Sequence, residues 1–200
     1  MTETIAVIGA GQMGNGIAHV AAQAGVAVTM IDVSADAVAR GMATIEKNLE
    51  RQVNKGAIDG AARDAILGRI ATSTELDAVS GATVAIEAAT ERPDLKFKIF
   101  GDLDRLAPAG ALLATNTSSI SITEIAAKTK RPADVIGMHF MNPVPMMKLV
   151  EVIRGLATSD ATCARTMAFA TALGKTPVEA NDYPGFIANR ILMPMINEAA

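Results

Sequence analysis

The chain contains few aromatic side chains, one cysteine and two histidines. Aromatic residues make up 3% of the 200 residues and tryptophan is absent, so a hydrophobic core has to be built from aliphatic side chains and methionine. The single cysteine, Cys163, excludes a disulfide within the chain and favours a reducing compartment, where it is expected to be a small helix residue. No metal site is expected.

Strong charge and long apolar runs are also missing. The net charge is −3 and no basic cluster stands out, which argues against a nucleic-acid partner. No stretch is long or apolar enough to cross a membrane, and the first strand is expected so early that no leader peptide fits before it. We therefore expect a cytoplasmic protein with one large domain, or one domain and part of a second.

Glycine, in contrast, is placed in a pattern. An apolar strand over residues 4–8 runs into a Gly-x-Gly-x-x-Gly turn formed by Gly9, Gly11 and Gly14, and a second apolar run ends at Asp32. A strand, a glycine turn, a helix and a second strand ending in an acid together form a dinucleotide-binding unit. The backbone N–H groups at the helix start would face the pyrophosphate. The alternative is a structural unit of the same shape that binds no ligand.

Asp32 also bears on the choice of dinucleotide. A carboxylate at this position accepts hydrogen bonds from the adenosine ribose, whereas the 2′-phosphate of NADP would meet its negative charge. No arginine follows it directly. The sequence therefore favours NAD.

Strand-like and helical segments alternate, which is typical of a parallel sheet wrapped by helices. Strands are expected at 4–8, 27–31, 83–87, 111–114 and 135–138, and helices at 12–24, 36–55, 60–68, 95–106 and 121–128. The stretch 36–69 is longer than a crossover requires and is expected to project from the body. Its polar face, with Lys47, Asn48, Arg51 and Lys55, is most simply a solvated helix surface.

The pattern changes after residue 139. We expect strands at 148–153 and 175–179, a helix at 160–173, and an apolar helix from about residue 186. An apolar helix at the end of a chain needs a cover. The expected division is a domain over residues 1–183 and, over 184–200, the first helix of a helical domain that is cut short or covered by another subunit.

Two residues suggest acid–base chemistry. His139 ends a strand at the carboxyl edge of the sheet, where open α/β sheets place their ligands. Glu151 lies inside an otherwise apolar strand, so its carboxylate must reach solvent or find a partner. A strand–turn–strand connection would return Glu151 to His139 and orient the imidazole as a base. The alternative places Glu151 on a solvent-facing edge; His19 is expected only to pack or lie at the surface.

Polar side chains follow two further strands. Asn116, Thr117, Ser118 and Ser119 follow the strand at 111–114 and either cap the next helix or face a ligand. Glu91 follows the strand at 83–87 and either stabilises the start of the next helix or faces the same ligand.

Together these motifs resemble the L-3-hydroxyacyl-CoA dehydrogenase family, in particular its bacterial 3-hydroxybutyryl-CoA members. The resemblance covers essentially the whole chain and rests on Gly9–Gly14, Asn116–Ser119, Gly137–Pro145, Lys148–Val152 and Pro184–Arg190. It implies a Rossmann-type doubly wound sheet, NAD as cofactor, an acyl-CoA substrate and a homodimer formed through a C-terminal helical domain.

The resemblance also implies residue roles. His139 is the catalytic base, Glu151 orients it, and Ser118 and Asn189 contact the reacting group. The residues expected to bind the cofactor are Gly9, Gly11, Gln12, Met13, Gly14, Asp32, Glu91, Lys96, Asn116, Ser118 and Asn142. The projecting helices contact CoA through Asn48 and Lys55, although some members carry serine at position 48. Ser118, outside these helices, is also expected to contact the CoA substrate.

Two other functions stay open. One is a related β-hydroxyacid dehydrogenase that acts on a free acid with a lysine base, which nothing at His139 suggests. The other is a catalytically impaired or silent NAD-binding protein, against which an intact His139–Glu151 pair argues. Acyl chain length and the pathway are not determined by the sequence.

Overall fold

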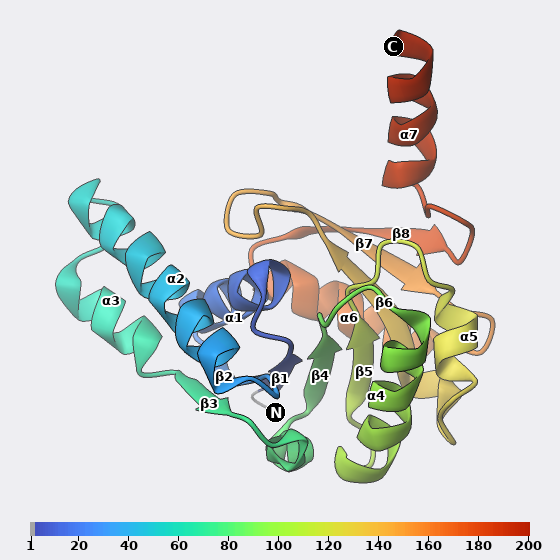
Figure 1. The fold of residues 1–200 in the computed structure, drawn as a ribbon, viewed down its shortest axis with the longest axis horizontal. Helices are drawn as coiled ribbons and strands as arrows, with labels where there is room; N and C mark the ends of the chain where they lie inside the picture. Colours follow the sequence, from blue (N-terminus) through green and yellow to red (C-terminus); the bar gives the residue numbers. More distant parts are fainter. Residues whose placement is uncertain (1–2) are drawn as a thin grey trace.

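The computed structural model describes residues 3–200 and contains one eight-stranded sheet with helices on both faces (Figure 1). The strand order is β3-β2-β1-β4-β5-β6-β7-β8, and every neighbouring pair is parallel except β6 and β7. The strands are β1 (Thr4–Ile8), β2 (Ala27–Ile31), β3 (Ile70–Ser73), β4 (Val84–Glu87), β5 (Leu112–Thr115), β6 (Val135–Phe140), β7 (Leu149–Arg154) and β8 (Thr176–Asn181). The α-helices are α1 (Gln12–Gln23), α2 (Ala35–Asn54), α3 (Gly60–Leu67), α4 (Pro93–Leu106), α5 (Ile122–Ala126), α6 (Asp160–Ala172) and α7 (Ala188–Ala199), and two short 3-10 helices are η1 (Leu76–Gly81) and η2 (Pro132–Asp134).

Each face of the sheet has its own aliphatic core. Successive side chains of a strand point to opposite faces, so Ile5 and Val7 of β1 pack with α1, α2 and α6, while Ala6 and Ile8 pack with α4 and α5. Burial on both faces explains why the central strands are continuously apolar rather than alternating. The predicted doubly wound fold is confirmed.

The strand order reverses beside β1. The chain runs outward from β1 to β2 and β3 and then returns to β4 on the other side of β1. In open α/β sheets this reversal leaves a crevice at the carboxyl ends of the strands, where ligands bind. The glycine turn after β1 and the polar segments after β4, β5 and β6 therefore meet at one edge.

The stretch 36–69 forms the expected projecting arm, consisting of α2 and α3 at the left of Figure 1. The strand after it, β3, was not predicted. It is a short edge strand of sequence Ile-Ala-Thr-Ser, and its two middle residues are exposed, so it has no apolar pattern to mark it. Pairing with β2 creates this strand.

Helix α7 extends away from the body of the molecule in Figure 1. Its apolar side chains are exposed, among them Ile191, Leu192, Met195 and Ile196. Within residues 3–200, no helix combines the length and the apolar character needed to cross a membrane.

Candidate active site

The glycine turn between β1 and α1 is shaped for close backbone approach. Gly9 has φ 107°, and a Cβ at Gly14 would lie 1.8 Å from the carbonyl oxygen of Gly9. A Cβ at Gly11 would meet no protein atom within 4 Å, so the space before it is open. Helix α1 begins at Gln12 with no side-chain cap. Its first N–H groups are therefore available to an anion, and the turn fits a dinucleotide pyrophosphate.

Asp32 joins the end of β2 to this turn. Its Oδ2 accepts a hydrogen bond from Ala10 N at 2.9 Å, and its Oδ1 accepts one from Ser34 N at 3.0 Å. Each carboxylate oxygen has capacity for a further hydrogen bond. The side chain thus stabilises the turn and still has acceptors for a ribose.

His139 and Glu151 face each other across the antiparallel pair β6 and β7. They are direct register partners, and His139 Nδ1 lies 2.8 Å from Glu151 Oε2. The side chains are nearly enclosed, with residue exposures of 6% and 1%. The predicted return of Glu151 to His139 is confirmed, and the solvent-facing alternative for Glu151 is wrong.

The second oxygen of Glu151 is also bonded. Oε1 accepts hydrogen bonds from Ile187 N at 2.9 Å and Ala188 N at 2.8 Å, at the start of α7. Both carboxylate oxygens therefore lie within hydrogen-bonding distance of nitrogen atoms, and Oε2 can accept from Nδ1. We therefore assign the imidazole proton to Nδ1, which leaves Nε2 as an acceptor.

Ser118 lies on the open side of His139. Its Oγ is 3.2 Å from His139 Nε2, and its carbonyl oxygen accepts a hydrogen bond from Asn189 Nδ2 at 3.3 Å. Asn116 Oδ1 accepts from Phe140 N at 2.9 Å and so joins the end of β5 to β6. The capping alternative for 116–119 is wrong, because the cap of α5 is Ser121, whose Oγ accepts from Glu124 N.

The comparison with known proteins agrees with this geometry. The NAD binding domain of 3-hydroxyacyl-CoA dehydrogenase matches residues 4–183. The chain belongs to this family. NAD is accordingly its cofactor.

Individual relatives are similar over nearly the whole chain. A 3-hydroxybutyryl-CoA dehydrogenase of Bradyrhizobium diazoefficiens is 53% identical over 98% of this chain and 67% of its own length. The crystal structure of (S)-3-hydroxybutyryl-CoA dehydrogenase from Ralstonia eutropha has a TM-score of 0.97 and 48% identity, covering 100% of this chain and 70% of the other. A 3-hydroxyadipyl-CoA dehydrogenase of Escherichia coli is 44% identical over 98% of this chain and 42% of its own length.

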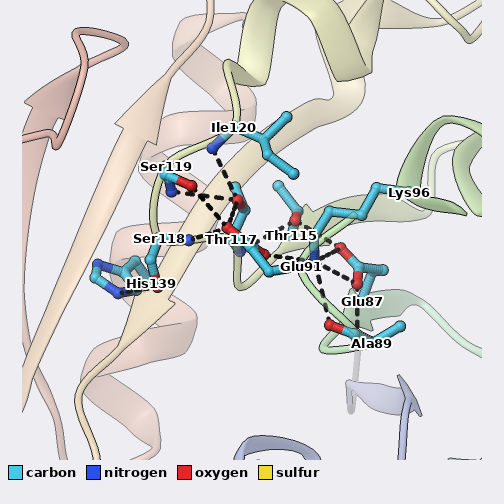
Figure 2. Close-up of polar contacts among 10 residues, drawn as sticks. All are labelled: Glu87, Ala89, Glu91, Lys96, Thr115, Thr117, Ser118, Ser119, Ile120 and His139. Carbon is cyan, nitrogen blue, oxygen red and sulfur yellow. Dashed lines mark hydrogen bonds and ion pairs between the residues drawn. The ribbon is translucent and has the colours of Figure 1, made fainter. Parts of the chain in front are cut away.

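A buried ion-pair network lies near His139 (Figure 2). Lys96 Nζ lies 2.7 and 2.9 Å from the two carboxylate oxygens of Glu87 and 3.1 Å from Oε2 of Glu91. Glu87 also accepts hydrogen bonds from Thr115 Oγ1 and Ala89 N, both at 2.7 Å. Glu87 and Lys96 are 0% and 1% exposed, and every charge has a partner, as burial requires.

Glu91 connects this network to the segment that contains Ser118. Its Oε1 accepts hydrogen bonds from Ser118 N at 2.9 Å, from Ser119 Oγ at 3.2 Å and from the hydroxyl of Thr117. Burial acts to raise the pKa of Glu91, but the hydrogen bond from Thr117 and the charge of Lys96 outweigh it and lower the pKa. Figure 2 shows the chain of contacts from Glu87 to Ser118 and His139.

Glu87 is a site residue that the sequence reasoning missed. It stands in the apolar strand Val-Ala-Ile-Glu, the same signal that singled out Glu151. An unpaired carboxylate is costly in a buried strand, so the same argument predicts a cation for Glu87. Lys96, one turn into the following helix, is that cation.

The remaining predicted residues are more exposed. Asn142 lies just beyond β6. Asn48 and Lys55 face the loop between β6 and β7 across a cavity of about 370 Å³, whose lining is His19, Asn48, Arg51, Gln52, Lys55, Ala57, Pro143, Pro145 and Met146. The solvated-surface alternative for this helix face is therefore incomplete, because part of the face lines a cavity.

His19 is a packed side chain, which is one of the two placements expected for it. It is 1% exposed, and its Nε2 lies 3.2 Å from Gln52 Nε2. Burial lowers the pKa of His19 below its ordinary value, because it disfavours the charged imidazole. Across residues 3–200, no group of three or more histidine, cysteine or acidic side chains is arranged to hold a metal ion.

Proposed function

We propose that this chain oxidises (S)-3-hydroxyacyl-CoA to 3-oxoacyl-CoA with NAD and catalyses the reverse reduction. The observation that carries the proposal is the imidazole of His139, which is held at Nδ1 by Glu151 and presents Nε2 beside Ser118 at the carboxyl edge of the sheet. The names of the similar proteins support an acyl-CoA substrate, and two of them favour a four-carbon acyl group.

His139 acts as the base in the oxidation. Its Nε2 accepts the proton of the 3-hydroxyl group as the C3–O bond becomes a carbonyl and the hydrogen at C3 leaves as hydride. Bound NAD supplies the acceptor for that hydride. Glu151 stabilises the imidazolium that results, because its Oε2 lies 2.8 Å from Nδ1.

In the reduction, the imidazolium of His139 returns the proton to the oxygen at C3. Ser118 Oγ lies 3.2 Å from Nε2, within reach of an oxygen that binds there, and Asn189 is held against the Ser118 backbone. The Asn189 amide has a second N–H beyond the one that it donates to Ser118 O. In our proposal this N–H and the Ser118 hydroxyl donate to the developing alkoxide and so stabilise the transition state.

The exposed fractions of Glu91 and Lys96 indicate which of the two side chains can contact the cofactor. The Glu91 side chain is 40% exposed and reaches the crevice, whereas Lys96 is 1% exposed and lies behind it. We propose that Glu91, Asn116, Ser118 and Asn142 contact the nicotinamide half and that Lys96 acts by holding Glu91. The pyrophosphate would be held by the turn Gly9–Gly14, which includes Gln12 and Met13. The ribose would be held by Asp32.

The cavity between the arm and the loop after β6 supports a CoA site. Arg51 and Lys55 provide cations, and Pro143 and Met146 provide an apolar wall. Cations suit the phosphate groups of CoA, and an apolar wall suits the alkyl segments of its pantetheine chain. Asn48 and Lys55 are the side chains that we propose to contact CoA.

A homodimer and a separate C-terminal unit are further proposals. The family match ends at residue 183, and α7 lies beyond it with an exposed apolar face. Such a face requires cover. We propose that residues 1–183 form the NAD-binding domain, that 184–200 belong to a helical unit, and that a second copy contributes to its cover; light scattering of the purified chain tests the dimer.

An absorbance assay of NADH tests the reaction. We expect NADH consumption with acetoacetyl-CoA and none with free acetoacetate. Turnover of free hydroxy acids alone would indicate the related β-hydroxyacid dehydrogenase, and NAD binding without turnover of either substrate would indicate a silent NAD-binding protein.

A further inference from the structure

The segment between β8 and α7 closes over the His139–Glu151 pair. It contains Phe186, which has φ 49° and is the one residue other than glycine with a positive φ between residues 3 and 200. A bulky side chain in this region is strained, and such strain persists only where the surrounding structure enforces it. Phe186 is 3% exposed, so the strained backbone conformation places its ring in the interior of the protein.

The Phe186 ring packs directly against the imidazole. The centroids of the two rings lie 6.0 Å apart with planes at 61°, an edge-to-face arrangement. This contact restricts rotation of the His139 ring and covers the hydrogen bond between Nδ1 and Glu151 from water.

The backbone after Phe186 holds the other member of the pair. Ile187 N and Ala188 N donate to Glu151 Oε1, while Oε2 faces His139. The two donors on Oε1 fix the orientation of the carboxylate and, with it, the position of Oε2 beside Nδ1. One turn of the chain therefore determines the position of both the ring and the carboxylate.

The turn is anchored on its other side. The carboxylate of Asp182 accepts four hydrogen bonds from the start of α5: from Ser121 Oγ and Thr123 Oγ1 at 2.7 Å, from Thr123 N at 2.8 Å and from Ile122 N at 2.9 Å. Within the turn, Phe186 N donates to Tyr183 O at 2.8 Å. The backbone at Phe186 is thus held between α5 and Glu151.

We propose that Phe186 is a positioning residue for the reaction, acting through His139 and, by way of the turn that contains it, through Glu151. The inference rests on the proposed dehydrogenase function. A merely structural role would affect the stability of the fold but would leave the chemistry of the imidazole unchanged.

The test compares Phe186→Leu with Phe169→Leu. In both variants leucine replaces a buried aromatic side chain, since Phe186 and Phe169 are 3% and 4% exposed, but Phe169 lies in α6 and only Phe186 packs against the imidazole. We expect Phe186→Leu to lower kcat about tenfold or more with the KM for NADH within about twofold, because small misplacements of catalytic groups are costly. Phe169→Leu should keep the wild-type kcat.

Imidazole NMR gives a readout that does not need turnover. The chain has two histidines, so the His139 signals are identified by their loss in His139→Gln. We expect Phe186→Leu to shift or broaden the His139 ring signals and to change their pH titration, with the His19 signals unchanged. Phe186→Met, with a flexible side chain that adapts to the same space, replaces Phe186→Leu if that variant does not fold.

The outcomes separate the two proposals. Wild-type kcat and unchanged His139 signals in a folded Phe186→Leu or Phe186→Met variant would overturn the positioning role. A wild-type chain without turnover of acetoacetyl-CoA contradicts the proposed function instead, and the NMR comparison still decides the role of Phe186.

Discussion

Two buried glutamates at the same edge of the sheet have different uses. Glu87 ends β4 and Glu151 lies in β7; they are 0% and 1% exposed, and each has a nitrogen partner at 2.7 or 2.8 Å. The partner of Glu87 is a lysine ammonium, which can only donate hydrogen bonds, and that of Glu151 is an imidazole, whose second nitrogen can accept one. The same type of contact therefore gives a fixed ion pair at Glu87 and, in the reaction that we propose, a proton acceptor beside Glu151.

Access to the crevice reinforces the difference. Lys96 directs its ammonium group to Glu87 and Glu91 inside the protein, whereas His139 uses Nδ1 for Glu151 and keeps Nε2 toward Ser118. A nitrogen can take part in chemistry only if substrate reaches it. The difference between the two glutamates lies in the partner and its access rather than in the depth of burial.

Removing the imidazole tests the proposed role of His139, the partner of Glu151. His139→Gln should lower kcat by about 10³- to 10⁴-fold, the contribution of a general base. Glutamine has no comparable basicity but keeps hydrogen-bonding groups. NAD affinity, measured by calorimetry, should change little, and wild-type turnover in this variant would remove His139 from its assigned role.

Glu151→Gln tests the orientation of the imidazole. A glutamine cannot accept from Nδ1 and from the two N–H groups of α7 with opposite ends of its amide, so either contact fails or the imidazole proton moves to Nε2. We expect kcat to fall roughly 10³-fold, within the range that general acid–base catalysis contributes. Turnover within a few fold of wild type would show that the carboxylate does not set the tautomer.

Glu87→Gln tests how much the ion pair between Glu87 and Lys96 stabilises the fold. Removing one charge of a buried pair costs about 3 to 5 kcal/mol of unfolding free energy, and we expect the lower end because Glu91 still faces Lys96. Urea denaturation measures the change. Asp94→Asn, which breaks the exposed pair with Arg92, is the matched control and should leave stability nearly unchanged.

Asp32→Ala tests a carboxylate that is not enclosed. Its hydrogen bonds to Ala10 and Ser34 and the proposed bonds to ribose are lost, so the Kd for NAD should rise about tenfold to a hundredfold. Calorimetry provides the measurement. Asp36→Ala removes an exposed acid of α2 and serves as the control; equal affinities for the two variants would contradict the ribose role.

Several features were predictable because their signals are local. Glycine spacing, an acid after β2 and an unpartnered carboxylate inside an apolar strand indicated the turn, Asp32 and Glu151 without any coordinates. The same reasoning applied to Glu87 would have found its pairing with Lys96. The choice between capping and ligand contact for Asn116–Ser119 stayed open because short polar side chains suit both roles. The structure excludes capping, since Ser121 is the cap of α5.

The amino-acid sequence by itself determined the order of strands and helices apart from β3 and the two 3-10 helices, the cofactor turn and the residues available for acid–base chemistry, because hydrophobic period and turn chemistry act over a few residues. The tertiary structure decided what the spacing left open, namely whether Glu151 faces His139 or solvent. The antiparallel register of β6 and β7 brings His139 to Glu151, and the turn at Phe186 adds donors from α7 to the same carboxylate. These contacts join segments far apart in the chain, and their geometry depends on packing that no local pattern encodes.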